Sequence, residues 1–99
     1  MTVNDFMKEN MEAIREVIND LPDMFDSHDF IKKFSKRFEV DYVYMLANAG
    51  STEPFQNVNS KIGSFLSNNQ TMLRIESQGE VFSENVFGNN SECKMWKKI

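Results

Sequence analysis

The chain has 99 residues, enough for one domain with its own core, and 40% of them are apolar, which excludes a disordered chain. The single cysteine, Cys93, and the single histidine, His28, exclude an internal disulfide and argue against a zinc site or a histidine-based triad. We therefore expect no metal site and no cofactor, and we interpret Cys93 as a core or half-buried residue. The net charge of -4 argues against indiscriminate binding to phosphates.

Charge is distributed unevenly along the chain. Residues 1–29 contain two basic and eight acidic residues, whereas residues 30–99 contain nine basic and seven acidic residues. An acidic N-terminal segment therefore precedes a mildly basic body. The acids among the first twenty residues argue against a signal peptide, and no apolar run reaches membrane-spanning length. We expect a soluble, cytoplasmic protein with no membrane partner.

The first predicted element is an amphipathic helix from Val3 to Asn19, ended by Leu21 and Pro22. Its apolar residues recur at steps of three and four and form one stripe. The favoured interpretation is packing against the rest of the same domain. The alternative is the interface of a homodimer, because part of the stripe has coiled-coil spacing. That interface would consist of Met7, Met11, Ile14 and Ile18.

The second predicted helix covers residues 27–38, with Asp26 or Ser27 as its N-cap. Phenylalanine and isoleucine form its buried stripe, and basic residues lie on the opposite face. We interpret the basic face as solvated, with DNA phosphates or an acidic protein as the alternative contact. Its residues are Lys32, Lys33, Lys36 and Arg37.

The segment from Val40 to Ala47 is nearly all apolar, which predicts a short third helix enclosed on most sides, although a strand is also permitted. Gly50 ends it, and residues 50–56 form a break. The stretch "NVNSKIGSFLSNN", residues 57–69, predicts a fourth helix that begins between Pro54 and Val58. Its outer face carries amides and hydroxyls where a solvated helix usually carries Glu and Lys, and such side chains suit base edges.

After Gln70 the pattern becomes alternating and predicts two or three short antiparallel strands, from about residue 71 to residue 98, with Gly79 as the turn residue. Trp96 is interpreted as a core or cover residue, with stacking on a nucleobase as the alternative. The expected core of the domain draws on all these elements. It consists of Phe30, Phe34, Phe38, Val43, Leu46, Val58, Ile62, Phe65, Leu66, Leu73 and Ile75.

The order of these elements resembles the winged helix-turn-helix superfamily, through the "NVNSKIGSFLSNN" helix, the "LRIE" strand and the Gly79 turn. In that superfamily two helices present a third helix to the major groove of DNA, and a hairpin called the wing flanks it. The resemblance covers residues 27–99, with the acidic helix of residues 1–22 as an extension of the same domain. It implies an α+β, mostly helical fold: a three-helix core, a C-terminal β-hairpin and an N-terminal amphipathic helix.

No familiar catalytic motif is present, so we do not expect an enzyme. The predicted function is a sequence-reading DNA-binding domain of the kind found in small bacterial or phage regulators. A protein-interaction module of the same fold is the alternative. The fourth helix would read bases, and basic residues after it would contact the DNA backbone. The predicted DNA-binding residues are Gln56, Asn57, Asn59, Ser60, Lys61, Ser64, Arg74, Lys94, Lys97 and Lys98.

Overall fold

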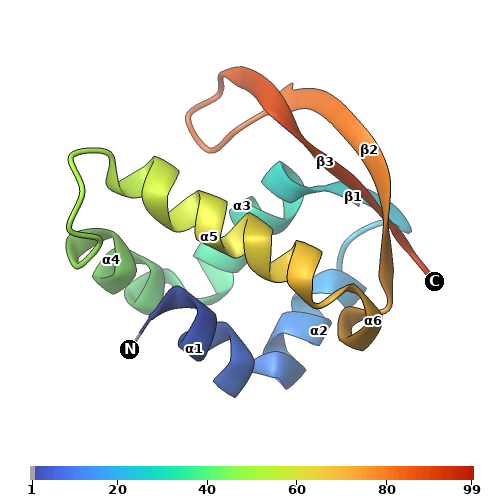
Figure 1. The fold of residues 1–99 in the computed structure, drawn as a ribbon, viewed down its shortest axis with the longest axis horizontal. Coiled ribbons are helices and arrows are strands. Elements are labelled where there is room, and N and C mark those ends of the chain that lie inside the picture. The colour runs from blue at the N-terminus through green and yellow to red at the C-terminus, as the bar shows by residue number, and fades with distance from the viewer. Residues whose placement is uncertain (1) are drawn as a thin grey trace.

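The computed structural model describes residues 2–99 of the chain. These residues form helices and a three-stranded antiparallel sheet (Figure 1). The predicted class, α+β and mostly helical with a C-terminal hairpin, is confirmed. No helix within residues 2–99 has the length and apolar character needed to cross a membrane. The elements are α1 (Val3–Glu9), α2 (Met11–Asn19), β1 (Met24–Asp26), α3 (Ser27–Arg37), α4 (Glu39–Ala47), α5 (Pro54–Asn68), α6 (Gln70–Leu73), β2 (Ile75–Glu84) and β3 (Asn90–Lys98).

The sheet has the order β1-β3-β2, so the last strand lies between the other two. Strand β1 was not predicted, because three residues are too few for a recognisable alternation. Phe25 of β1 lies opposite Trp96 of β3, and both side chains are fully buried. The indole N–H of Trp96 donates a hydrogen bond to Ser27 Oγ over 2.9 Å, which satisfies the one polar group of this side chain. Trp96 is thus a core residue, as predicted.

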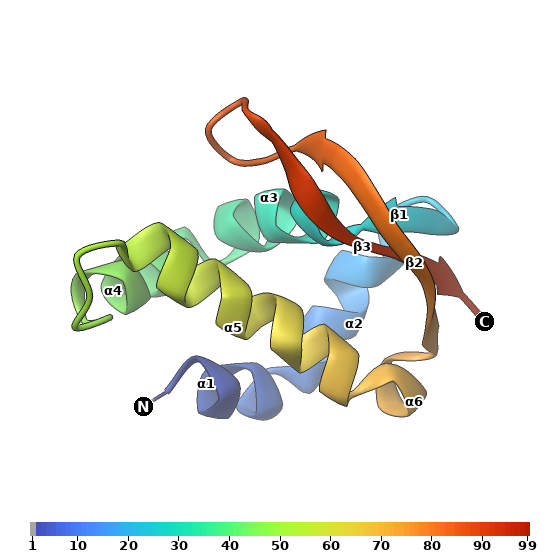
Figure 2. The ribbon, with the colours of Figure 1, turned by 45° about the horizontal axis from the view of Figure 1, so that its top comes forward.

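The predicted N-terminal helix is divided at Asn10 into α1 and α2. Asn10 has φ -113° and ψ 29°, and its side-chain amide donates a hydrogen bond to the Phe6 carbonyl. A short amide side chain competes in this way with regular helical hydrogen bonds. The bend allows α1 to contact α5 while α2 contacts α3 (Figure 2).

This packing removes the predicted dimer interface. Met7 and Ile14 have no exposed surface, Ile18 is buried, and Met11 is partly buried against the same core. These side chains fill the interior of their own domain, so they are not available to a second copy. The burial of these side chains agrees with the favoured interpretation, in which the helix packs against its own domain.

Helix α3 begins as predicted, with Asp26 as its N-cap. The Asp29 amide donates to Asp26 Oδ1 over 2.8 Å, and the Asp26 amide donates to Asp29 Oδ2 over 3.1 Å. This reciprocal capping box fixes the first turn of the helix. On the basic face, Arg37 pairs with Glu16 of α2 over 2.6 Å and Lys32 lies 3.9 Å from Glu84 of β2.

Helix α4 forms where a helix was predicted, but the prediction that it is enclosed on most sides is wrong. Val40, Val43 and Tyr44 are exposed, and the exposed fraction of Val43, an expected core residue, is 57%. Tyr42 is the one buried residue of this helix. Phe38 and Leu46 pack against the core while half-buried. The remaining expected core residues are confirmed as buried: Phe30, Phe34, Val58, Ile62, Phe65, Leu66, Leu73 and Ile75.

The two strands of the C-terminal hairpin are longer than the short strands predicted, and the turn between them lies elsewhere. Gly79 has φ 97° and lies within β2, at a shift in the pairing register between Ser77 and Glu80. A bulge of this kind accepts glycine readily because the left-handed region carries no penalty for it. The chain instead reverses at residues 85–89, where Asn85 Oδ1 accepts hydrogen bonds from the amides of Phe87 and Asn89.

The predicted strand at residues 71–73 is helical. Helix α6 occupies this position and ends at Leu73. Arg74 follows it with a left-handed φ of 55°, so β2 begins only at Ile75. Apolar residues in a single helical turn and in a short strand give the same weak periodic signal.

Candidate functional site

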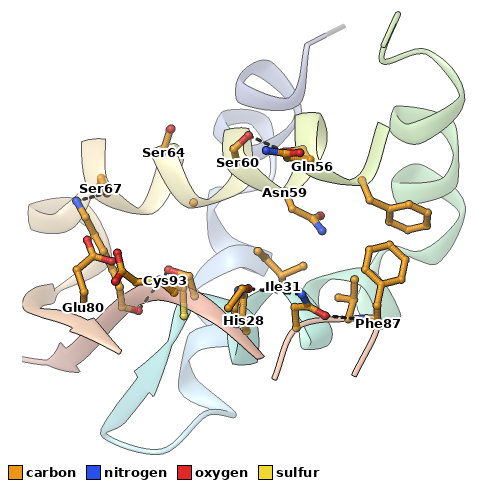
Figure 3. A pocket seen from close by; sticks show the side chains of 18 residues that line it. His28, Ile31, Gln56, Asn59, Ser60, Ser64, Ser67, Glu80, Phe87 and Cys93 are labelled. Atoms are coloured by element: carbon orange, nitrogen blue, oxygen red, sulfur yellow. Dashed lines mark hydrogen bonds between the residues drawn. The ribbon is translucent and has the colours of Figure 1, made fainter. Parts of the chain in front are cut away.

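A cleft of about 690 Å³ lies between α5, the first turns of α3 and the β2–β3 hairpin (Figure 3). Helix α5 forms one wall, because its buried stripe of Val58, Ile62, Phe65 and Leu66 fixes the rotation of the helix against the core. The polar residues next to that stripe consequently face the hairpin. They are Gln56, Asn59, Ser60, Ser64 and Ser67.

The opposite wall comes from the hairpin, and the floor comes from α3. His28 and Ile31 contribute the floor, while Glu80 of β2 and Cys93 of β3 are part of the wall. At one end the rings of Phe55 and Phe87 meet edge to face with 4.7 Å between their centroids. This contact joins the tip of the hairpin to the first turn of α5 (Figure 3).

The structure brings half of the predicted DNA-binding residues to this cleft: Gln56, Asn59, Ser60, Ser64 and Lys94 all line it. Lys94 Nζ lies 3.1 Å from Ser67 Oγ and 5.9 Å from the centroid of the Trp96 ring. Its ammonium group is therefore already held across the cleft to α5.

Two other predicted residues of α5 lie outside the cleft lining. Lys61 is exposed on the solvent side of the helix. Asn57 is half-buried, and its Oδ1 is buried without a hydrogen-bond partner among the described residues. The exposed strip of α5 is therefore narrower than predicted, and Asn57 lies at its edge.

The remaining basic residues are not brought to the cleft. Arg74 and Lys98 line a second hollow of about 370 Å³ beside α2 and α6. Lys98 Nζ donates to the carbonyl oxygens of Asn19 and Leu21, and so it caps the end of α2. Lys97 is exposed on β3, where its backbone is paired with Met24 and Glu76.

Asn59 is held in place by a tyrosine of α4. The hydroxyl of Tyr42 donates a hydrogen bond to Asn59 Oδ1 over 2.6 Å. Burial raises the pKa of Tyr42 above its ordinary value of 10.0, although the bond to Asn59 acts in the opposite direction. Tyr42 is thus a neutral donor at physiological pH, and the NH2 group of Asn59 is the part of the amide left for a ligand.

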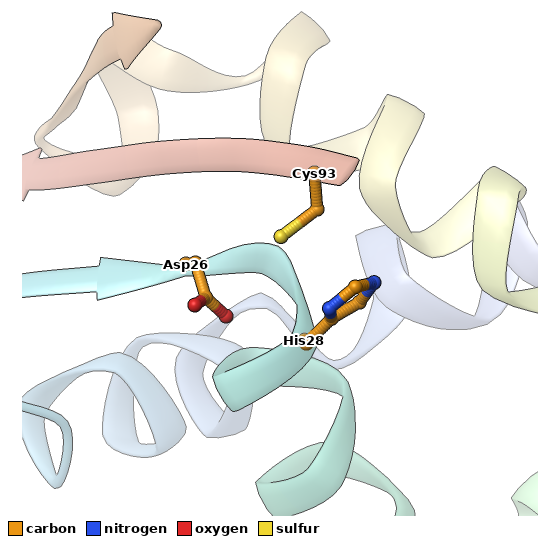
Figure 4. A group of neighbouring side chains, drawn as sticks. All are labelled: Asp26, His28 and Cys93. Atoms are coloured by element: carbon orange, nitrogen blue, oxygen red, sulfur yellow. The ribbon is translucent and has the colours of Figure 1, made fainter. Parts of the chain in front are cut away.

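A group of side chains that could bind a metal ion lies beside the cleft, and the sequence does not predict it. Asp26, His28 and Cys93 each place one nitrogen, oxygen or sulfur atom within 4.8 Å of the others (Figure 4). The sequence gives no signal for this group, because His28 and Cys93 are 65 positions apart and strand β1, which ends at Asp26, was not recognised. Only the pairing of β1 with β3 brings them together.

The cleft lining carries one positively charged residue, Lys94, and two negatively charged residues, Glu80 and Glu92. The side of α5 that faces solvent carries no carboxylate and one lysine, Lys61.

A scan of the sequence against family models finds no match, and neither a search of curated proteins nor a search of solved structures returns one.

Proposed function

We propose that this chain is a DNA-binding domain of the winged-helix kind, which reads base edges with the exposed side of α5. In this proposal the β2–β3 hairpin acts as the wing. The support is an arrangement in which the long helix crosses the molecule with one side open and with the hairpin alongside it (Figure 2).

One observation carries this proposal: α5 has no carboxylate over its fifteen residues, in a chain that contains fifteen Asp and Glu. An exposed carboxylate would repel the DNA backbone, and amides, hydroxyls and lysine are the groups that pair with base edges and phosphates. An exposed helix with no functional constraint ordinarily carries charges of both signs. The exposed residues of this strip are Gln56, Ser60, Lys61, Ser64 and Asn68.

The side chains would have different tasks in the complex. Gln56 can bond an adenine edge through both groups of its amide, whereas Asn59 offers its NH2 group, because its Oδ1 accepts from Tyr42. Lys61 can reach guanine or a phosphate. Arg74 and Lys97 are exposed and would contact the backbone, whereas Lys98 is engaged with the end of α2.

The test is a gel-shift series with random-sequence DNA between about 50 and 200 mM salt, followed by selection of preferred sequences. Asn59→Ala should relax the preference for one base pair by about 1–3 kcal/mol and leave the salt slope unchanged. Lys97→Ala should weaken all sequences and lower the slope by about one unit. Lys36→Ala, on the exposed face of α3 that we interpret as solvated, is the control that should change neither. Absence of retention at about 50 mM salt contradicts the proposal.

A protein-interaction module is the second candidate, and the exposed side of α4 favours it. Val43 and Tyr44 lie one helical turn after Val40 on that side, and the exposed fractions of Val40, Val43 and Tyr44 are 83%, 57% and 65%. A cluster of exposed apolar side chains is typical of contact surfaces. A photo-crosslinker at Val43 should then capture a partner that the same group at Lys36 does not capture, and Tyr44→Asp should abolish the capture. Equal labelling at both positions contradicts this candidate.

A further inference from the structure

The one cysteine and the one histidine of the chain lie beside each other, next to a buried carboxylate. Asp26 ends β1 and is 6% exposed, His28 lies in the first turn of α3, and Cys93 lies in β3. Figure 4 shows the three side chains as neighbours that come from these separate segments, with one ring nitrogen of His28 on the side of the Cys93 sulfur and the Asp26 carboxylate. One donor atom from each lies within 4.8 Å of the other two.

We propose that Asp26, His28 and Cys93 form a binding site for a divalent transition-metal ion of the zinc class. A thiolate, an imidazole and a carboxylate are the three kinds of protein ligand that Zn²⁺ takes. The combination of sulfur and nitrogen donors also disfavours Mg²⁺ and Ca²⁺, which take oxygen ligands.

The donor atoms need only small movements to enclose an ion. Ligand atoms around a tetrahedral Zn²⁺ lie roughly 3.5 Å apart, given bond lengths of about 2.0–2.3 Å. The present separations of at most 4.8 Å close to that distance by changes of side-chain rotation. Asp26 Oδ1 accepts the capping hydrogen bond from Asp29, so the second carboxylate oxygen is the one left for the ion.

Two serines of the hairpin already orient the imidazole. Ser83 Oγ lies 2.8 Å from His28 Nδ1 and 3.6 Å from Cys93 Sγ, and Ser91 Oγ lies 3.3 Å from His28 Nε2. A metal-bound histidine ordinarily holds a hydrogen-bond partner on its other ring nitrogen. Whichever nitrogen binds the ion, a serine hydroxyl is present for the other.

The fourth coordination position would open to the cleft. His28 and Cys93 both line the cleft, whereas Asp26 lies behind them and is not part of the lining. Three protein ligands with one open position are the pattern of zinc sites that hold water or an exogenous group. The site thus differs from a closed structural zinc site with four protein ligands.

The experiment is a titration of untagged, reduced protein with Co²⁺ and then with Zn²⁺. Because the chain has one cysteine, a thiolate-to-cobalt charge-transfer band can come only from Cys93. We expect one Co²⁺ per chain, displacement by Zn²⁺, and protection of Cys93 from a thiol reagent in the presence of Zn²⁺. At a free Zn²⁺ concentration 100-fold above Kd, the melting temperature should rise on the order of 10 °C.

Variants separate the site from adventitious binding. Cys93→Ser should remove the charge-transfer band, and His28→Gln should weaken Zn²⁺ binding more than about 100-fold, beyond the usual effect of losing an outer partner. Asp26→Asn removes the charge but keeps a capping acceptor, so α3 should still form. Glu80→Gln removes a nearby carboxylate of the cleft and should leave the affinity unchanged.

Three outcomes overturn the proposal: no stoichiometric binding at micromolar Zn²⁺, cobalt binding without a thiolate band, or equal affinity in His28→Gln and the unaltered protein. Circular dichroism of each variant without metal distinguishes loss of a ligand from loss of the fold. If a variant does not fold, the thiol-protection measurement on the unaltered protein still decides, because unprotected Cys93 contradicts the site. DNA binding by α5 is measured separately, so either proposal can fail alone.

Discussion

Helices α4 and α5 contact each other, yet they invert the usual relation between composition and burial. Helix α4 is nearly all apolar in sequence and exposes Val40, Val43 and Tyr44. Helix α5 is rich in amides and hydroxyls, and four of its side chains are fully buried. The exposed surface of α4 is thus more apolar than that of α5.

The difference shows that the arrangement of apolar residues, rather than their number, determines how a helix packs. The apolar residues of α5 recur on one stripe, so the whole helix can dock against the core along its length. Those of α4 surround the helix, and the domain offers it one surface, which Tyr42 contacts together with the half-buried Met45 and Leu46. The side that faces away is left without a neighbour in the described chain.

The largest loss of stability is expected from a substitution on the buried side of α5. Phe65 is 1% exposed, and Phe65→Ala should lower the free energy of unfolding by about 3–5 kcal/mol, because it removes buried surface and leaves a cavity. Denaturant unfolding measures this loss. A loss below about 1 kcal/mol would mean that α5 is not anchored through this stripe.

A smaller loss of stability is expected from a substitution at the contact between α4 and α5. Tyr42→Phe deletes the hydrogen bond to Asn59 and should lower the free energy of unfolding by about 1 kcal/mol at pH 7. The same denaturant experiment measures it, with Tyr44→Phe on the exposed side of α4 as the matched control. Equal stability of the two variants would show that the bond contributes nothing.

The next effect is confined to alkaline solution. The pKa of Tyr42 is raised in the folded state, so the folded protein keeps this proton at a pH where the unfolded chain releases it. The stabilisation of the folded state by the protonated Tyr42 hydroxyl is complete below pH 10.0, and it is lost as the pH rises from 10.0 through the pKa of Tyr42 in the folded protein. The unaltered protein should therefore lose stability faster than Tyr42→Phe above pH 10, in parallel unfolding curves.

The smallest change of stability is expected from a substitution on the exposed side of α4. Val43→Ser should change the free energy of unfolding by less than about 0.5 kcal/mol, as surface substitutions usually do. Thermal melting at several protein concentrations measures it and also reports self-association. A loss above about 1 kcal/mol, or a melting temperature that depends on concentration, would mean that this side is covered in solution.

Part of the candidate site was predictable from the sequence. The polar side of α5 follows directly from the stripe formed by Val58, Ile62 and Phe65, and Gln56, Asn59, Ser60 and Ser64 do share one surface. The cleft was not predictable, since its second wall depends on where the hairpin reverses. The sequence predicts that reversal at Gly79, but the chain reverses at residues 85–89, because glycine marks a bulge as readily as a turn.

The sequence by itself determined the features that depend on neighbours within one or two helical turns. These include the cap at Asp26, the buried stripes of α3 and α5, and the burial of Trp96 among alternating residues. Their signals repeat at the period of the element that contains them, so a short stretch is sufficient to recognise them.

Only the tertiary structure decided the features that depend on contacts between distant segments. Strand β1 and the proximity of His28 to Cys93 depend on the pairing of β1 with β3. The exposed side of α4 depends on the limited surface that the core offers to this helix. No local period encodes such a pairing, because its free energy comes from burial shared among several elements at once.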